Sequence, residues 1–484
     1  MPAMPFEIVI LWTDWAVFFL LAAGVVYVWR VRARADLRAR WRRVFADPVA
    51  MGCATVLGAL LAVAVLDSLH FRPALPQRAG ASAAYDTKTL SVLDLGLKHL
   101  IDSREDSYSA PLATHGFVKL TVPGHPELPR AFPRLKHAAL SLPESGRGWR
   151  ADVGRRLAEG VALGGALSAA MWGAVAVLRR REASRVPRTG AGGAPISPAS
   201  AHPLPWAVAV WTACALCMVG AVVGVLAAGY HVLGTDRTGN DVLYLSLKSV
   251  RTAFVIGGLT ELAMLPFALV LGIMAGYFKG WVDEAIQYLY TVVSSVPSIL
   301  LIAACVLMVQ VFLDQNPDLF ETGLQRADVK LLFLCVILGV TGWAGMCRLL
   351  RAETMKLREL EYVQAAEAFG VSHARIMRRH ILPNVMHLVL IATVLDFSGM
   401  ILYEAVLTYV GIGVDPSMNS FGVMINQARI EMSREPAVWW SFAAAFVFMV
   451  AIVLCVNLFA DAVREAFDPR ARALRPRPAL DATR

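Results

Sequence analysis

Three acidic residues, Glu261, Asp396 and Glu404, stand inside long apolar segments of this chain. A carboxylate in the hydrocarbon region of a bilayer is costly, so such residues are functional candidates by default. Acids in this setting could relay protons through a membrane carrier. Each could instead be a buried structural carboxylate paired with a neighbouring helix, and this interpretation is favoured for Glu261 and Asp396.

The seven cysteines offer little further chemistry. Cys214 and Cys217 form a C-x-x-C pair, a spacing found in redox and zinc sites. They fall on one face of an apolar segment with no histidine nearby, which favours packing and predicts no metal site. The chain also contains no Gly-Lys pair, so it lacks the phosphate-binding loop of many ATPases. We therefore expect no catalytic residue and no cofactor bound by this chain.

The composition of the chain indicates that these acidic residues and cysteines lie in membrane-spanning helices. Hydrophobic residues make up 57% of the 484 and charged residues only 17%, which is too apolar for one soluble core. A helix of about 20 apolar residues spans a bilayer. We predict an all-α polytopic membrane protein with nine such segments, at residues 8–29, 50–67, 157–178, 205–229, 253–277, 286–313, 330–350, 385–411 and 437–460.

Arginine is concentrated in the loops that follow the first, third, seventh and ninth segments, as at Arg38, Arg181, Arg375 and Arg470. Strict alternation places these four loops on one side, which the positive-inside rule makes cytoplasmic. The amino terminus is then outside and the carboxyl terminus inside. The net charge of +9 reflects residues beside the headgroups of membrane lipid, so nucleic acid is not an expected partner.

One polar stretch between two apolar segments, residues 361–384, has the pattern of a helical hairpin. Ala365 and Ala366 give its first helix a small face, and Gly370 can end that helix in the left-handed conformation. Ser372 can cap a second helix, which we expect to end before Pro383. Such a hairpin suits docking into a cleft of another protein. The alternative is an ordinary amphipathic cytoplasmic loop.

The hairpin resembles the coupling loop of membrane permeases of ABC importers, the loop that fits into the ATPase subunit. Gln364 stands where that family has the glutamate of its motif. The matching residues are Ala365, Ala366, Gly370, Ile381, Leu382 and Pro383.

A second block resembles the family branch that imports oligopeptides, dipeptides and nickel. That branch carries a G-T-D-x-x-G-x-D-V motif on the outside. Asn240 stands where the branch has arginine, and Asp241 can cap the helix that follows. Pro297 and Glu404 also fit family patterns, which makes Pro297, Glu261, Asp396 and Glu404 our candidates for an intramembrane gate or path. The matching outside residues are Gly234, Thr235, Asp236, Gly239 and Asp241.

The ordered agreement over about residues 230–470 identifies the chain as a C-type permease subunit of a peptide importer in the bacterial inner membrane. The resemblance implies a type I helical bundle and a heterodimer with a second, homologous permease. It also implies two ATP-binding subunits, which carry ATP and Mg²⁺, and an extracytoplasmic binding protein. A proton-coupled secondary transporter, an importer of nickel or another non-peptide solute and a non-transporting scaffold are the alternatives.

The front of the chain does not fit this six-span pattern. We expect an extension, residues 1–204, with about three spans, followed by a core at 205–470 whose coupling loop is 352–384 and a tail at 471–484. Either three spans were added in front, or 50–67 is the family's first span and a helical hairpin was inserted later. Residues 68–156 form an outside segment that is either a small domain contacting the binding protein or a loop capping the bundle. Residues 182–204 form a Gly/Pro/Ser linker.

Overall fold

The structure, a computed structural model, is almost entirely helical. Among the described residues, eight helices are long and apolar enough to cross a membrane, and a bent pair with an angle of 41° would make a ninth span. This confirms the predicted all-α polytopic class. The structure describes residues 6–75, 85–86, 88–119, 130, 132–138, 140, 142–143, 148–185, 204–320 and 322–467. Two predicted segments lie outside them: residues 186–203 of the linker and the tail at 471–484.

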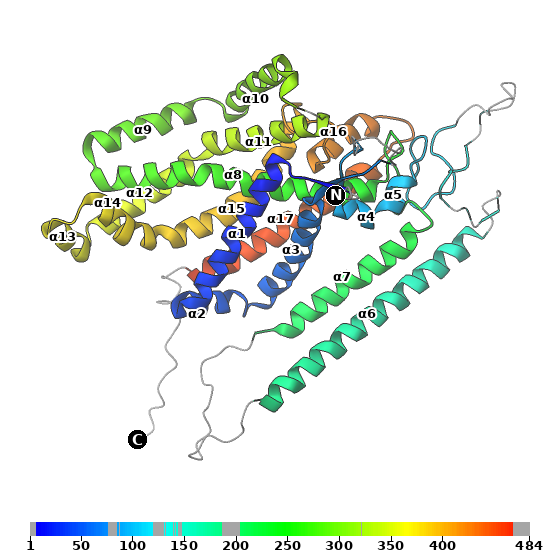
Figure 1. Cartoon of the computed structure of the whole chain (residues 1–484), viewed down its shortest axis with the longest axis horizontal. Coiled ribbons are helices and arrows are strands. Elements are labelled where there is room, and N and C mark those ends of the chain that lie inside the picture. The colour runs from blue at the N-terminus through cyan, green and yellow to red at the C-terminus, as the bar shows by residue number, and fades with distance from the viewer. Residues whose placement is uncertain are drawn as a thin grey trace, which may run out of the picture.

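The spanning helices follow the predicted apolar segments in order (Figure 1). They are α1 (Trp12–Ala33), α3 (Pro48–Asp67), α6 (Trp149–Arg185), α7 (Trp206–Ala227), α8 (Val242–Phe278), α10 (Ser298–Gln315), the bent pair α11 (Gly323–Gly342) and α12 (Ala344–Arg358), α15 (Leu382–Tyr409) and α17 (Trp440–Phe467). The shorter helices are α2 (Ala35–Val44), α4 (Val92–Gly96), α5 (Lys98–Asp102), α9 (Gly280–Ser295), η1 (Pro317–Leu319), α13 (Glu361–Ala368), α14 (His373–Ile376), η2 (Met377–Ile381) and α16 (Phe421–Met432).

Helix α8 is the centre of the bundle, with α3, α11, α12, α15 and α17 packed around it. Small residues allow these close approaches, as is typical of membrane helices. A Cβ atom added at Gly276 would lie 2.6 Å from the carbonyl oxygen of Arg351 on α12. One added at Gly339 of α11 would lie 2.8 Å from the carbonyl oxygen of Thr260 on α8. The bundle is therefore held by backbone contact at glycines.

A small antiparallel sheet lies at one end of the bundle. Strand β1 (Phe6–Val9) pairs with β2 (His70–Pro73), which pairs with β3 (Leu90–Ser91), in the order β1-β2-β3. The start of the chain is therefore on the same side as the segment after α3. Figure 1 shows this sheet end with α4, α5 and α16 at the right and the α13 end at the left.

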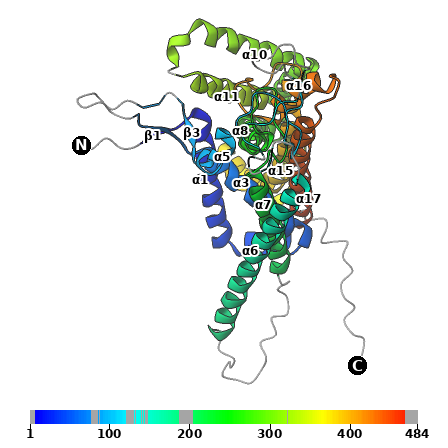
Figure 2. The same cartoon turned by 90° about the vertical axis from the view of Figure 1, so that its right-hand side faces the viewer.

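Helices α6 and α7 form a hairpin at the edge of the bundle (Figure 2). Gly160 and Gly164 have the G-x-x-x-G spacing of closely packed membrane helices. A Cβ atom at Gly160 would lie 2.7 Å from the Cα atom of Val222, and one at Gly164 would lie 2.9 Å from the Cα atom of Met218. The hairpin rests on α3 through α7, whereas α3 itself packs on both α8 and α17.

One predicted span is wrong in the structure. Residues 286–313 are not one helix, because α9 ends at Ser295 and α10 begins at Ser298. Pro297 disfavours helical backbone at the residue before it, and Val296 is extended, with φ −85° and ψ 133°. Pro297 also lacks the N–H that a continuous helix would need. The break turns this part of the chain into a short helix followed by a span.

Candidate functional site

The predicted hairpin at 361–384 is formed by α13 and α14. Gly370 ends α13 with a φ of +72°, the left-handed conformation that glycine adopts readily. The N–H of Val371 donates to the carbonyl oxygen of Ala366 at 3.1 Å, which closes the turn. Ser372 stands at the N-cap of α14, although its hydroxyl makes no capping hydrogen bond. The two helices thus meet at a tight, glycine-dependent turn.

The second helix of the hairpin does not end before Pro383, contrary to the prediction. It continues through the π-turn η2 (Met377–Ile381) into the spanning helix α15. Pro383 lies in the first turn of α15, where a missing N–H costs least. The wider π-turn interrupts the regular hydrogen-bond ladder just before the proline ring. The hairpin is therefore joined to a membrane span without a loop.

The hairpin presents one face outward and buries the other. Ala366 and Leu382 pack against a core cluster that includes the fully buried Ile381. The outward face is formed by Gln364, Ala365, Gly370 and Pro383. The sequence interpretation missed Phe369, whose side chain is 88% exposed at the tip. An aromatic residue directly before a helix-ending glycine was the signal that could have identified it.

Polar contacts fix the hairpin to the spanning helices. Arg351 of α12 donates to both carboxylate oxygens of Asp283 on α9, at 2.5 and 2.7 Å. The hydroxyl of Tyr277 at the end of α8 lies 2.8 Å from Nδ1 of His373. Gln364 donates from Nε2 to the carbonyl oxygen of Glu359 at 3.3 Å, so its amide supports the hairpin locally. These contacts join α12 to α9 and join the hairpin to the end of α8.

The outside block, residues 231–242, is a compact turn at the opposite end of α8. Gly234 and Gly239 have φ values of +74° and +78°, and only glycine adopts such values without strain. The carboxylate of Asp236 accepts hydrogen bonds from the backbone and side chains of Thr238 and Asn240. Asp241 caps α8, as predicted, by accepting from the N–H of Leu243 at 2.8 Å.

The block is joined to the segment after α5. Thr235 donates its N–H to the carbonyl oxygen of Ser109 at 3.1 Å, and Ser109 donates its N–H to Oγ1 of Thr235 at 2.6 Å. The N–H of Glu105 donates to the carbonyl oxygen of Gly239 at 3.0 Å. Trp440, at the start of α17, donates from Nε1 to the carbonyl oxygen of Thr235 at 2.9 Å. The block is therefore joined to two parts of the chain that are distant in sequence, residues 105–109 and the start of α17.

His231 is a second residue that the sequence interpretation did not select. Its side chain is buried between Asp241, at 2.7 Å from Nδ1, and Glu105, at 3.5 Å from Nε2. Burial lowers the pKa of His231, but the hydrogen bond to Asp241 and the nearby carboxylate of Glu105 outweigh it and raise the pKa from 6.5 to about 9. Glu105 is also desolvated, yet the nearby His231 and the N–H groups of Lys136 and His137, which donate to it, hold its pKa below 4.5.

The His231 contacts predict a loss of stability at alkaline pH. A histidine whose pKa is higher in the folded state stabilises fully below pH 6.5, and this contribution is lost as pH rises through about 9. The pKa shift corresponds to a contribution of roughly 3 kcal/mol to the free energy of unfolding. Limited proteolysis of the 103–119 segment should therefore accelerate between pH 7.5 and 10. His231→Gln should be cleaved faster at pH 7.5 and lose the histidine-dependent part of that slope; an unchanged slope would contradict the assignment.

Glu404 lies on α15 and is buried at the end of the bundle that carries α16. Its Oε1 accepts from the hydroxyl of Thr408 at 2.7 Å and from that of Ser420 at 3.0 Å. A Cβ atom at Gly422 would lie 2.7 Å from the same oxygen. The carboxylate thus holds the start of α16 against α15. Its role as a candidate for an intramembrane gate or path stays a prediction.

Glu261 lies on α8 and Asp396 on α15, two helices that pack against each other. Glu261 is 3% exposed, and neither of its carboxylate oxygens has a hydrogen-bond partner in the described part of the chain. Asp396 is half-buried. The fourth candidate, Pro297, lies in the break between α9 and α10. The hydroxyl of Tyr403 on α15 donates to Oγ of the neighbouring Ser298 at 2.9 Å, so the start of α10 contacts α15 beside Glu404.

The family model for the inner membrane component of binding-protein-dependent transport systems matches residues 268–473. The chain is 31% identical over 245 residues to the oligopeptide transport system permease protein OppC of Mycobacterium bovis, covering 51% of this chain and 78% of that protein. The chain is 30% identical to OppC of Haemophilus influenzae, in a match that covers 50% of this chain and 72% of that protein. A glutathione transport system permease protein, GsiD of Pectobacterium atrosepticum, is 29% identical with 50% and 74% covered.

The chain belongs to this family of transport permeases. The matched residues run from the last three turns of α8 through α17 and include the whole hairpin at 361–384. The family helices therefore form the bundle around α8. The outside block at 231–242 lies ahead of the family-model match. Helices α1 to α7 also precede it.

Proposed function

We propose that this chain forms one half of the membrane path of an ATP-driven importer of peptides. The exposed hairpin tip at Phe369 and Gly370 carries this proposal, because it is an apolar projection within the arginine-rich segment that follows α12. The relatives' names support peptides as cargo: oligopeptide, dipeptide and glutathione transport share substrates with amide-linked residues.

The partners follow from the same reasoning. A second, homologous permease completes the path, and two ATP-binding subunits carry ATP and Mg²⁺ and receive the two hairpins. A binding protein outside the membrane delivers the peptide to the end that carries the block at 231–242. The amino terminus lies outside and the carboxyl terminus in the cytoplasm, since the arginine-rich end faces the cytoplasm.

The transport step uses the contacts described above. Closure of the ATP-binding subunits moves the hairpin, and the Arg351–Asp283 pair and the Tyr277–His373 contact pass this movement to α12, α9 and α8. Because α8 runs from the hairpin end to the outside block, the same rigid helix reaches both faces of the membrane. Alternating access then requires no covalent chemistry in this chain.

Disulfide cross-linking tests the hairpin assignment. Single cysteines replace Phe369 and Ser372 in a background without the seven native cysteines, in membranes that contain the ATP-binding subunit with a cysteine in its cleft. We expect cross-links whose yield changes with ATP. Met432→Cys on α16 is the control and should give none. Accessible cysteines on the hairpin that never cross-link would overturn the proposal and favour a secondary carrier.

A further inference from the structure

An apolar cavity of about 970 Å³ lies between α1 and the bundle. One wall is α1, from Val17 to Arg32, and the other includes Leu61 of α3, Phe254 of α8 and Phe459 of α17. Ser68 lines it at the sheet end and Trp41 at the opposite end. The cavity therefore follows the membrane-spanning height of the protein. No residue named among the transport contacts above lines it.

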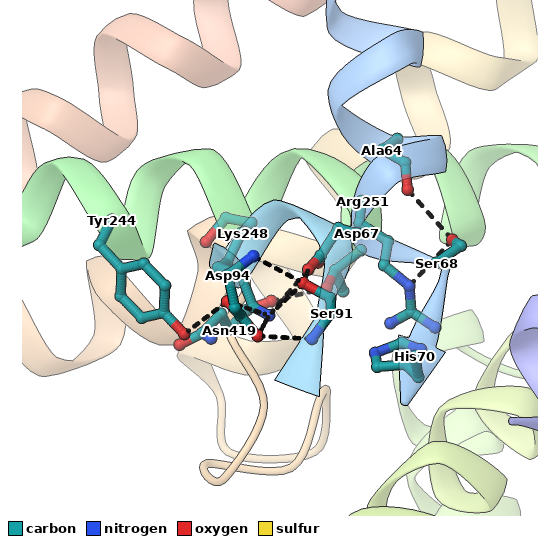
Figure 3. A network of polar contacts seen from close by, with 12 residues as sticks. Ala64, Asp67, Ser68, His70, Ser91, Asp94, Tyr244, Lys248, Arg251 and Asn419 are labelled. Carbon is teal, nitrogen blue, oxygen red and sulfur yellow. Dashed lines mark hydrogen bonds and ion pairs between the residues drawn. The ribbon is translucent and has the colours of Figure 1, made fainter. Parts of the chain in front are cut away.

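Helix α1 is attached to the bundle near both of its ends. At the sheet end, Arg251 of α8 donates to Asp14 at 2.6 Å, to the hydroxyl of Thr13 at 2.8 Å and to that of Ser68 at 3.1 Å. Figure 3 shows Arg251 between Ser68 and His70. Thr13 and Asp14 are the only residues of α1 that are buried. Ala16 and Val17 pack against the core cluster that includes Val255, and the later turns of α1 leave space behind them.

The other attachment is made by α2. Trp41 donates from Nε1 to the hydroxyl of Tyr27 on α1 at 3.0 Å. The Trp41 ring stacks on Phe459 of α17, with a centroid distance of 6.4 Å. Aromatic side chains of this kind collect at the level of lipid headgroups. Helix α1 is thus held to the bundle near its start by Arg251 and near its end by Trp41.

The lining between these attachments cannot hold ordered water. It is apolar over most of its height, and a buried water needs two to four polar partners. Gly24 keeps the space open, because a Cβ atom added there would meet nothing within 4 Å. A hydrocarbon chain satisfies such a surface without any unpaired polar group.

The arginine-rich end of the cavity indicates which kind of lipid headgroup it would bind. Arg32 lines the cavity, and Arg30 precedes it in the last turn of α1. Arg42 and Arg43 stand in the last turn of α2. A cluster of arginines at a membrane surface attracts anionic lipid. We propose that this cavity binds an anionic phospholipid, with an acyl chain behind α1 and the phosphate at Arg32.

The test uses phosphatidylglycerol with a photoreactive diazirine on one acyl chain, added to the permease purified with its partner subunits. We expect labelling of peptides from α1 and α17, reduced by an excess of unlabelled phosphatidylglycerol and much less by phosphatidylcholine. Gly24→Trp fills the cavity and should reduce this labelling at least about tenfold, because several methylene contacts are lost. Arg32→Gln should retain labelling but lose the preference for the anionic headgroup.

The matched control is Gly224→Trp on α7, because Gly224 is also exposed with nothing within 4 Å of an added Cβ atom. It should label like the unchanged protein. Equal labelling in Gly24→Trp and the control would overturn the proposal. So would labelling spread evenly over α6 and α10, the result expected for unbound bilayer lipid. A cross-link from Val28→Cys to a helix of a partner subunit would assign the cavity to that helix instead.

Discussion

Replacing Phe369 with aspartate should abolish most peptide uptake while the protein still accumulates in the membrane. The side chain is 88% exposed, so its loss removes little packing from the folded chain. On the proposed function it enters the cleft of the ATP-binding subunit, and a buried aromatic anchor of this kind contributes about 2 kcal/mol or more to binding. That loss corresponds to roughly a thirtyfold weaker contact. The initial rate of uptake of a radiolabelled peptide into membrane vesicles with ATP measures it.

Phe369→Leu is the matched control, because it keeps an apolar side chain at the tip. It should retain most of the uptake. Quantification of the permease in the same vesicles separates loss of coupling from loss of protein. If Phe369→Asp imports peptide at the normal rate, Phe369 makes no contact that the importer needs.

Gly239→Ala should detach the outside block from the segment that contains Glu105. A Cβ atom at Gly239 would lie 1.8 Å from the carbonyl oxygen of Glu105, a backbone atom that has no rotamer by which to move away. The φ of +78° adds strain for any residue with a Cβ atom. Together these effects should cost about 3 kcal/mol or more. Faster proteolysis of the 103–119 segment and a lower Tm of the purified permease measure the effect.

Gly411→Ala isolates the contact with Glu105 from the backbone strain. Gly411 also has a positive φ, +89°, but an added Cβ atom would meet nothing within 4 Å. The Gly411→Ala protein should therefore lose only about 1 kcal/mol of its free energy of unfolding. Equal destabilisation by the two substitutions would mean that the close approach at Glu105 contributes nothing to holding the segment.

Much of the architecture was predictable because its signals are local. A run of apolar residues can satisfy its own backbone in lipid only as a helix, so the spans followed from hydropathy alone. Gly370 and Asp241 were identified because helix ends have residue preferences that act within a few positions. The break at Pro297 was missed because a proline inside an apolar segment is compatible with either a kinked or a broken helix.

The sequence by itself determined the membrane class, the order of the spans, the hairpin at 361–384 and the resemblance to a permease family. Tertiary structure alone decided which residues meet across long separations. Arg251 reaches Asp14 across 237 positions, and His231 lies between Asp241 and Glu105. Charge pairing of this kind has no periodicity in sequence, since it depends on how α1, α8 and the outside segment pack. The exposure of Phe369 and the cavity behind α1 have the same origin: they are properties of surfaces that exist only after the helices have assembled.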